Sequence, residues 1–173
     1  MSKAIRILLI SDTHSFLDTS IQPYAQSADE VWHAGDIGKI DVLDKLAKWN
    51  SNVKAVYGNI DDHILRVSCP LYHFFTIGKH RVLMIHIAGA LGKYNVKTRA
   101  LIQEYNPTLL VCGHSHILKV KKDHRYNLLY MNPGAAGNHG FHKVRTLLRF
   151  NLLPDKMEAL EVIELGKRGR LKP

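Results

Sequence analysis

Five short apolar segments of this 173-residue sequence each end in residues that can bind a metal ion, and this arrangement constrains the fold more than any other feature. Such apolar runs are typical of strands buried on both faces of a sheet. The segments end at Asp12-Thr13-His14, Gly35-Asp36, Gly58-Asn59, His86 and Gly113-His114-Ser115-His116. In open α/β sheets, ligands bind beside the carboxyl ends of the strands. We therefore expect these polar side chains to meet at one edge of a sheet.

The order of apolar runs and turn signals predicts an α/β fold with two packed sheets. Apolar residues at helical spacing predict helices over residues 41–49 and 94–105. Strands are predicted over residues 6–11, 30–34, 53–57, 72–77, 81–85, 108–112, 117–122, 128–131, 144–150 and 157–165. Because the early part reads as βαβ and the late part is rich in strands, an α/β/β/α sandwich is favoured.

Length and composition favour one domain over residues 1–173, with a basic and mobile tail from about residue 167. A chain of this size buries roughly 70% of its unfolded surface and needs no disulfide. The two cysteines, Cys69 and Cys112, are expected to be buried apolar groups. The first apolar run is too short to cross a membrane and lacks a signal-peptide cleavage pattern. We therefore expect a cytoplasmic protein without a membrane partner.

The net charge of +9 allows attraction to phosphate-bearing partners, including nucleic acid. The basic residues are spread along the chain, with small clusters over residues 119–122 and 167–172. No aromatic RNA-binding signature accompanies these clusters. Solvated surface charge is therefore the favoured interpretation, and a nucleic-acid partner is the alternative.

Taken together, the order DxH, GD, GN, H and GHxH resembles the calcineurin-like metallophosphoesterase superfamily, and within it the small YfcE-type phosphodiesterases. The resemblance covers about residues 4–165, and the turn Asn132-Pro133-Gly134 supports the narrower match. It implies an α/β/β/α sandwich of the metallophosphoesterase type. It also implies a hydrolase with two divalent metal ions, first of all Mn²⁺, with Fe, Zn²⁺ or Ni²⁺ as alternatives.

The same resemblance assigns a role to each strand-end residue. One metal ion would be bound by Asp12, His14 and His116. The second would be bound by Asn59, His86 and His114, and Asp36 would bridge both ions. Imidazole, carboxylate and amide groups suit Mn²⁺, Fe or Zn²⁺, which agrees with this assignment. A hydroxide between the ions would attack the phosphorus of a small phosphoester substrate, so that Asp36, Asn59 and His86 would be catalytic through the metals.

Two positions depart from the family pattern. Many members have histidine after Gly-Asn, and YfcE-type members have cysteine, whereas Ile60 stands here. Because isoleucine cannot protonate a leaving group, we expect good leaving groups to be preferred; His63 is a weak substitute. The usual His-Gly-His is replaced by His86-Ile87-Ala88, which leaves the substrate open. Asp61 is expected to orient a neighbouring group, or only to cap a turn.

Several alternatives stay open. A non-catalytic scaffold such as the trafficking subunit Vps29 of this superfamily is disfavoured, because all seven ligand positions are intact. A phosphodiesterase acting on a small or nucleotide-like diester is favoured over a phosphomonoesterase. Segments near residues 15–28 and 87–95 are expected to set specificity. His139 and His142 are weaker candidates for the mouth of the site. A homo-oligomer is compatible with the sequence, which gives no direct sign of it.

Overall fold

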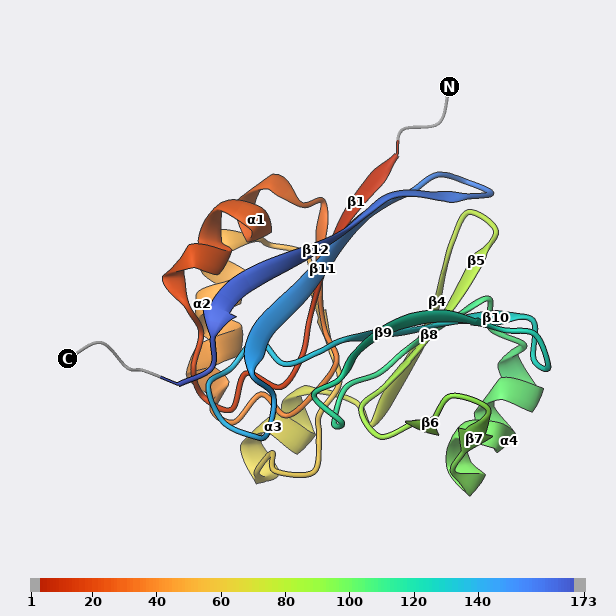
Figure 1. The fold of residues 1–173 in the computed structure, drawn as a ribbon, viewed down its shortest axis with the longest axis horizontal. Coiled ribbons are helices and arrows are strands. Elements are labelled where there is room, and N and C mark those ends of the chain that lie inside the picture. The colour runs from red at the N-terminus through yellow and green to blue at the C-terminus, as the bar shows by residue number, and fades with distance from the viewer. Residues whose placement is uncertain (1–3, 170–173) are drawn as a thin grey trace.

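The computed structural model describes residues 4–169, which form two five-stranded sheets packed against each other (Figure 1). The first sheet has the order β12-β11-β1-β2-β3. Its strands are β1 (Ile5–Ile10), β2 (Glu30–His33), β3 (Val53–Ala55), β11 (Val144–Leu152) and β12 (Met157–Lys167). The second sheet has the order β4-β5-β8-β10-β9. Its strands are β4 (Tyr72–Ile77), β5 (His80–Ile85), β8 (Leu109–Val111), β9 (Leu118–Asp123) and β10 (Leu128–Pro133).

Helices cover the outer faces of the two sheets. The helical segments are the 3₁₀ helix η1 (Thr19–Ile21) and the α-helices α1 (Gln22–Ser27), α2 (Ile40–Trp49), α3 (His63–Ser68) and α4 (Val96–Tyr105). Figure 1 shows α1 and α2 beside the first sheet and α4 beside the second. A short hairpin of β6 (Gly89–Ala90) and β7 (Lys93–Tyr94) precedes α4. None of the helices within residues 4–169 is long and apolar enough to span a membrane.

Each sheet has parallel strands at its centre. In the first sheet β1 pairs in parallel with β2, and β2 with β3. In the second sheet β8 pairs in parallel with both β5 and β10. The carboxyl ends of these strands therefore lie together within each sheet. A hydrogen bond of 2.7 Å between His86 Nδ1, after β5, and the Ala34 carbonyl, after β2, shows that the two sets of ends also meet each other.

The apolar core is divided into layers by the period-two alternation of the strands. In β1, Ile7 and Leu9 point between the sheets, where they join Trp32 and Met84 in one buried cluster. Leu8 and Ile10, on the opposite face of β1, pack under α1 and α2 in a second cluster. A third cluster lies between the second sheet and α4. This layering confirms the predicted α/β/β/α sandwich.

The predicted strands and the two predicted helices are present, with ends shifted by a few residues. Two helices of six residues, α1 and α3, were not predicted because their sequences are too short to show a helical period. In the segment 15–28, Ile21 and Ala25 are fully buried against the first sheet, so part of this segment builds the core. Lys167 ends β12, and the Arg168 amide donates to the Lys143 carbonyl. Residues 170–173 of the predicted tail lie outside the described residues.

Candidate metal centre

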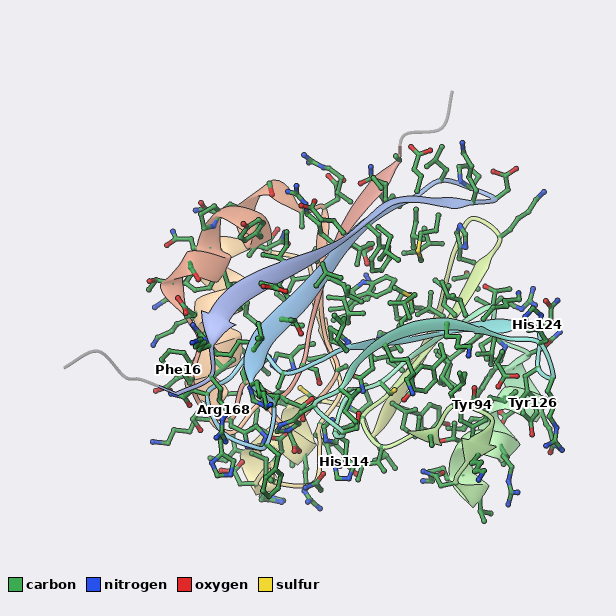
Figure 2. All side chains as sticks on the ribbon, viewed as in Figure 1. Phe16, Tyr94, His114, His124, Tyr126 and Arg168 are labelled. Atoms are coloured by element: carbon green, nitrogen blue, oxygen red, sulfur yellow. The ribbon has the colours of Figure 1, made fainter. Side chains whose placement is uncertain are left out.

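The loops that follow β1 and β2 are joined backbone to backbone, which places their polar side chains together. The Asp12 amide donates to the Gly35 carbonyl at 2.9 Å, and the His14 amide donates to the Asp36 carbonyl at 3.0 Å. The His114 amide, in the loop after β8, donates to Asp12 Oδ2 at 3.1 Å. Three loops that are far apart in sequence thus converge; Figure 2 labels His114 at the edge of the molecule where they meet.

The first group of candidate ligands consists of Asp12, His14 and His116, each of which offers one atom within 4.8 Å of the others. His116 Nε2 lies 3.1 Å from Asp12 Oδ1, and His14 Nε2 lies 4.0 Å from the same oxygen. The Asp12 carboxylate is fully buried, whereas the two imidazoles are only partly covered. This set of one carboxylate and two imidazoles is typical of a divalent transition-metal site.

The second group consists of Asp36, His86 and His114, again with one atom each within 4.8 Å of the others. His86 Nε2 lies 3.2 Å from Asp36 Oδ1. The hydrogen bond to the Ala34 carbonyl requires a proton on His86 Nδ1, because a carbonyl only accepts. Nε2 of neutral His86 therefore carries the lone pair that a metal ion would use.

The two groups meet at Asp36. Its Oδ1 faces His86 in the second group, and its Oδ2 lies 3.6 Å from His14 Nε2 in the first group. Three buried atoms of the two groups have no hydrogen-bond partner, namely Asp12 Oδ1, His14 Nε2 and His86 Nε2. A buried polar atom without a hydrogen-bond partner lowers the stability of the fold, so three such atoms close together indicate a site that binds cations.

Asn59 is the remaining sequence-predicted ligand, and its neighbours Gly58 and Ile60 lie against Asp36. The next residue, Ile60, donates its amide to Asp36 Oδ1 at 3.1 Å, so the Asn59 loop wraps around that carboxylate. Asn59 and His86 line one cavity together. The structure thus brings the loops of all seven predicted ligands to one place, and their role as ligands is taken up below as a proposal.

The backbone of the site is held in an unusual conformation. Among the described residues, nine residues other than glycine have a positive φ, and five of these are predicted ligands: Asp12, His14, Asp36, His114 and His116. The left-handed region costs a residue with a Cβ atom about 1–2 kcal/mol. Such strain is tolerated where the surroundings over-determine it and is concentrated at functional sites.

Two glycines are required because other atoms approach their α-carbons closely. A Cβ atom on Gly58 would lie 2.1 Å from Asp36 Oδ1. A Cβ atom on Gly113 would lie 2.0 Å from Ser11 Oγ and 2.6 Å from Asp12 Oδ2. The glycines in the GN and GHxH motifs therefore make room for the carboxylates of the other loops.

The electrostatics of the site favour bound positive charge. Burial alone would raise the pKa of Asp36, but the adjacent His86 imidazole and a hydrogen bond from the Ile60 amide lower it below its ordinary value. Burial alone would lower the pKa of His86, yet the neighbouring carboxylates of Asp36 and Asp12 raise it above its ordinary value. For His14, burial outweighs the attraction of the same carboxylates, and its pKa is lowered.

Asp61 fixes two of the ligand loops to each other. Its Oδ1 accepts from the Gly38 amide and its Oδ2 accepts from the Gly58 amide, both at 2.7 Å. The loop carrying Asp36 and the loop carrying Asn59 are therefore joined through one buried carboxylate. These bonds to turn amides are those of a turn-capping carboxylate, and the orienting role of Asp61 stays a prediction. His63 is exposed at the first position of α3.

His142 contacts a candidate ligand directly. His142 Nε2 lies 2.9 Å from the Gly137 carbonyl and must donate to it, which leaves Nδ1 as an acceptor. This Nδ1 lies 3.2 Å from Nδ1 of His116, which therefore donates and directs its Nε2 toward Asp12. His139 packs against the His14 ring, with centroids 5.1 Å apart. Both histidines lie in or beside a glycine-rich segment without strand periodicity. The sequence therefore indicates their place at the site only weakly.

Asn132, at the end of β10, holds the loop that carries His114 and His116. Its Nδ2 donates to the Gly113 carbonyl at 2.8 Å and to Ser115 Oγ at 3.1 Å. The sequence singled out this residue only as part of a turn. Its role depends on a contact between β10 and the loop after β8 that no local pattern reveals.

Two cavities open beside the centre. The larger has a volume of about 510 Å³ and includes Asn59 and His86 in its wall. The smaller has a volume of about 250 Å³ and includes His114. Ile87 lines both cavities.

Comparison with known proteins connects this geometry to a family. A family model described as the calcineurin-like phosphoesterase superfamily domain matches residues 5–153. No curated protein sequence matches the chain. Among solved structures, a predicted phosphoesterase from Streptococcus pneumoniae has a TM-score of 0.72 at 18% identity, over 95% of this chain and 91% of that chain.

Two other solved structures show the same fold with different descriptions. A protein described as a novel archaeal phosphodiesterase has a TM-score of 0.72 at 19% identity, over 93% of this chain and 100% of that chain. Vps29 from Entamoeba histolytica, solved with Zn²⁺, has a TM-score of 0.67 at 16% identity, over 92% of this chain and 99% of that chain. At these identities the likeness establishes a shared fold.

Proposed function

Because the chain belongs to the calcineurin-like phosphoesterase superfamily, we propose that it hydrolyses phosphodiesters at a centre of two divalent metal ions. The observation that carries this proposal is the meeting of two ligand groups at one buried carboxylate, Asp36. One ion would be held by Asp12, His14 and His116, and the other by Asn59, His86 and His114, with Asp36 between them. Nitrogen and oxygen donors suit Mn²⁺, with Fe, Zn²⁺ and Ni²⁺ as alternatives.

The residues of the chain contribute geometry to this reaction. When bound, two divalent ions would neutralise the oxygens of a phosphoester and activate a water molecule. His86 and His116 have their tautomers fixed by Ala34 and His142, so that each directs Nε2 into the centre. Ile60 replaces the usual acid and cannot donate a proton to a leaving oxygen. The proposal therefore expects faster hydrolysis of esters with acidic leaving groups.

A diester fits the surroundings of the centre better than a monoester does. A diester carries two ester groups on phosphorus, and two cavities adjoin the centre, one lined in part by His114 and the other by Asn59 and His86. A monoester would fill only one of them. The archaeal phosphodiesterase with the same fold supports this choice.

A protein-binding scaffold is the second candidate, because Vps29 proteins share the fold. Scaffold function alone would not require the buried, partnerless atoms of Asp12, His14 and His86 to face one another. We therefore favour the enzyme. A cytoplasmic location stays a prediction. A homo-oligomeric state is compatible with the sequence, and a nucleic-acid partner stays the alternative that the sequence does not favour.

Hydrolysis of bis-p-nitrophenyl phosphate and of p-nitrophenyl phosphate tests the proposal. The chain should hydrolyse the diester faster, only with an added divalent ion such as Mn²⁺, and Asp36→Asn should remove this activity. Asp123→Asn is the matched control, since Asp123 is a buried carboxylate at the end of β9 that accepts a hydrogen bond from the Tyr94 hydroxyl of β7. Metal-independent hydrolysis, or full activity of Asp36→Asn, would contradict the proposal.

A further inference from the structure

We propose that the cavity of about 510 Å³ beside Asn59 and His86 binds one ester group of the substrate and that this group is aromatic. The inference rests on the proposed function, because it assumes that the phosphorus is held at the metal centre. It adds the chemical class of the group attached to that phosphorus.

The cavity begins at the candidate metal ligands and leads away from them. Asn59 and His86, both assigned to the second ion, form part of its wall. The wall also includes Tyr57, Leu71 and, in the first turn of α4, Val96. A substituent on a phosphorus bound at the centre would therefore extend into this space. Its volume lies within the range of roughly 300–1,000 Å³ that is typical of small-molecule sites.

The wall of the cavity is chiefly apolar. Leu71, Ile87 and Val96 contribute aliphatic groups, and Tyr57 contributes a ring. Ile87 and Val96 are 39% and 74% exposed, so the protein core does not account for their apolar character. Asn95, the polar residue between them in the wall, already uses its side chain for the Ile87 carbonyl and the Thr98 amide. An apolar ligand group would gain by covering these side chains.

Arg66 makes an aromatic group a better occupant than an aliphatic one. Its guanidinium lies over the Tyr57 ring, with Cζ 5.2 Å from the centroid. It also donates to the Asp61 carbonyl at 2.7 Å and to the Asn59 carbonyl at 3.2 Å. The guanidinium is thus held in one orientation at the wall, where it can stack on a second ring. Lys97 adds another positive charge to this wall.

Calorimetric binding of two simple diesters to the Mn²⁺-loaded protein tests the inference. Diphenyl phosphate and dimethyl phosphate carry the same charged group and differ in their ester groups. We expect diphenyl phosphate to bind roughly tenfold more tightly, because one phenyl group becomes buried. In Val96→Asp this ratio should fall to about one, since a solvated charge enters the apolar wall. The introduced Asp repels both anionic diesters to a similar extent, so this repulsion does not change the ratio of their two affinities.

Val67→Asp is the matched control. Val67 is 73% exposed on α3, close to the 74% of Val96, and does not line the cavity. This variant should keep the wild-type ratio. Equal binding of the two diesters, or an unchanged ratio in Val96→Asp, would overturn the inference. If neither diester binds when metal is present and no diester is hydrolysed, the proposed function itself fails, and this outcome is distinct from the first.

Discussion

The side chain of His142 illustrates how a residue outside the ligand set can control it. Its Nδ1 accepts a hydrogen bond from Nδ1 of His116, and its Nε2 donates a hydrogen bond to the Gly137 carbonyl. A partner of this kind fixes the tautomer and the ring orientation of a metal ligand. The Asp12–His14–His116 group therefore depends on a histidine that no spacing rule connects to it.

Replacement of His142 should weaken one metal site and spare the other. We expect His142→Gln to lower the affinity of the first site by about 10–100-fold, a typical effect for the loss of such a partner. At limiting Mn²⁺ the bound metal should fall from two ions toward one per chain, and excess Mn²⁺ should restore both binding and activity. His124→Gln, at an exposed turn, serves as the control. Equal weakening of both sites would contradict this role.

His33 makes stability depend on pH in a defined direction. Burial lowers its pKa from 6.5 to about 4, and its neutral ring accepts from the Gly35 amide and bonds Thr13. The unfolded chain therefore binds a proton on His33 at a higher pH than the folded chain does. Its contribution to stability is fully present above about pH 6.5 and is lost as the pH falls toward 4.

Urea unfolding at pH 7 and pH 4.5 measures this contribution. The free energy of unfolding should fall by up to about 3 kcal/mol between these values because of His33. In His33→Gln, which cannot titrate, the fall should be smaller by a similar amount. If the free energy of unfolding depends on pH identically in the two proteins, His33 has the same pKa in the folded and the unfolded chain and is already protonated in the folded chain at pH 4.5.

The meeting of the candidate ligands could be predicted at this scale, because each one follows an apolar run and stands in a motif; their role as ligands stays a proposal. The residues that orient them could not. His142, Asn132 and Arg66 act through contacts between segments that are distant in sequence, and their local patterns resemble ordinary loop and helix surfaces.

Among the elements, the loop after β8 is held in place by a side chain of another strand, β10. Asn132 at the end of β10 donates to Gly113 and Ser115, and its Oδ1 accepts from the Gly134 amide. The Asn132 side chain therefore connects two segments through hydrogen bonds: the loop that carries His114 and His116, and the turn at the end of β10.

Asn132→Asp should loosen the loop without removing the turn. The carboxylate can still accept from the Gly134 amide, but it cannot donate to the Gly113 carbonyl, which then keeps only the Ser115 amide as its donor. A buried carboxylate oxygen would also face that carbonyl oxygen, which is unfavourable. We expect a loss of about 1–3 kcal/mol in the free energy of unfolding and weaker binding of both metal ions, since each site has one ligand in this loop. Denaturant unfolding and Mn²⁺ titration measure the two effects. Unchanged metal affinity would refute the proposed role of the loop.

Element boundaries show where periodicity succeeds and where it fails. The long apolar strands and the helices α2 and α4 were predicted, because each has enough residues to display its period. The six-residue helices α1 and α3 were not predicted. Asp62 caps the start of α3 by accepting from the Leu65 amide, but a capping residue alone does not identify so short a helix in the sequence. The segment 15–28 was interpreted as a specificity loop, yet much of it packs under the first sheet.

At the scale of the whole molecule, the candidate metal centre joins the two sheets. Asp12 and Asp36 come from the first sheet, whereas His86 and His114 follow strands of the second. The parallel strands at the middle of each sheet bring these ends together, so the architecture could be predicted from the order of elements. The packing angle and the cavities could not, because they depend on side chains from many segments.

Metal ions should therefore stabilise the whole fold. A ligand that binds only the folded state adds about 2.7 kcal/mol at a concentration 100 times its Kd. We expect Mn²⁺ to raise Tm by several degrees over that of chelator-treated protein, and Asp36→Asn to lose most of this shift. Asp123→Asn should retain the shift. An equal rise in Asp36→Asn would place the stabilising ions elsewhere on the protein.

The most direct measurement of the central claim is the metal content and metal position of the intact protein. A crystal of the Mn²⁺-loaded chain, with data collected at the manganese absorption edge, should contain two anomalous peaks on either side of Asp36, and plasma emission analysis should give two ions per chain. A single peak, or peaks remote from Asp12, Asp36 and His86, would contradict the account.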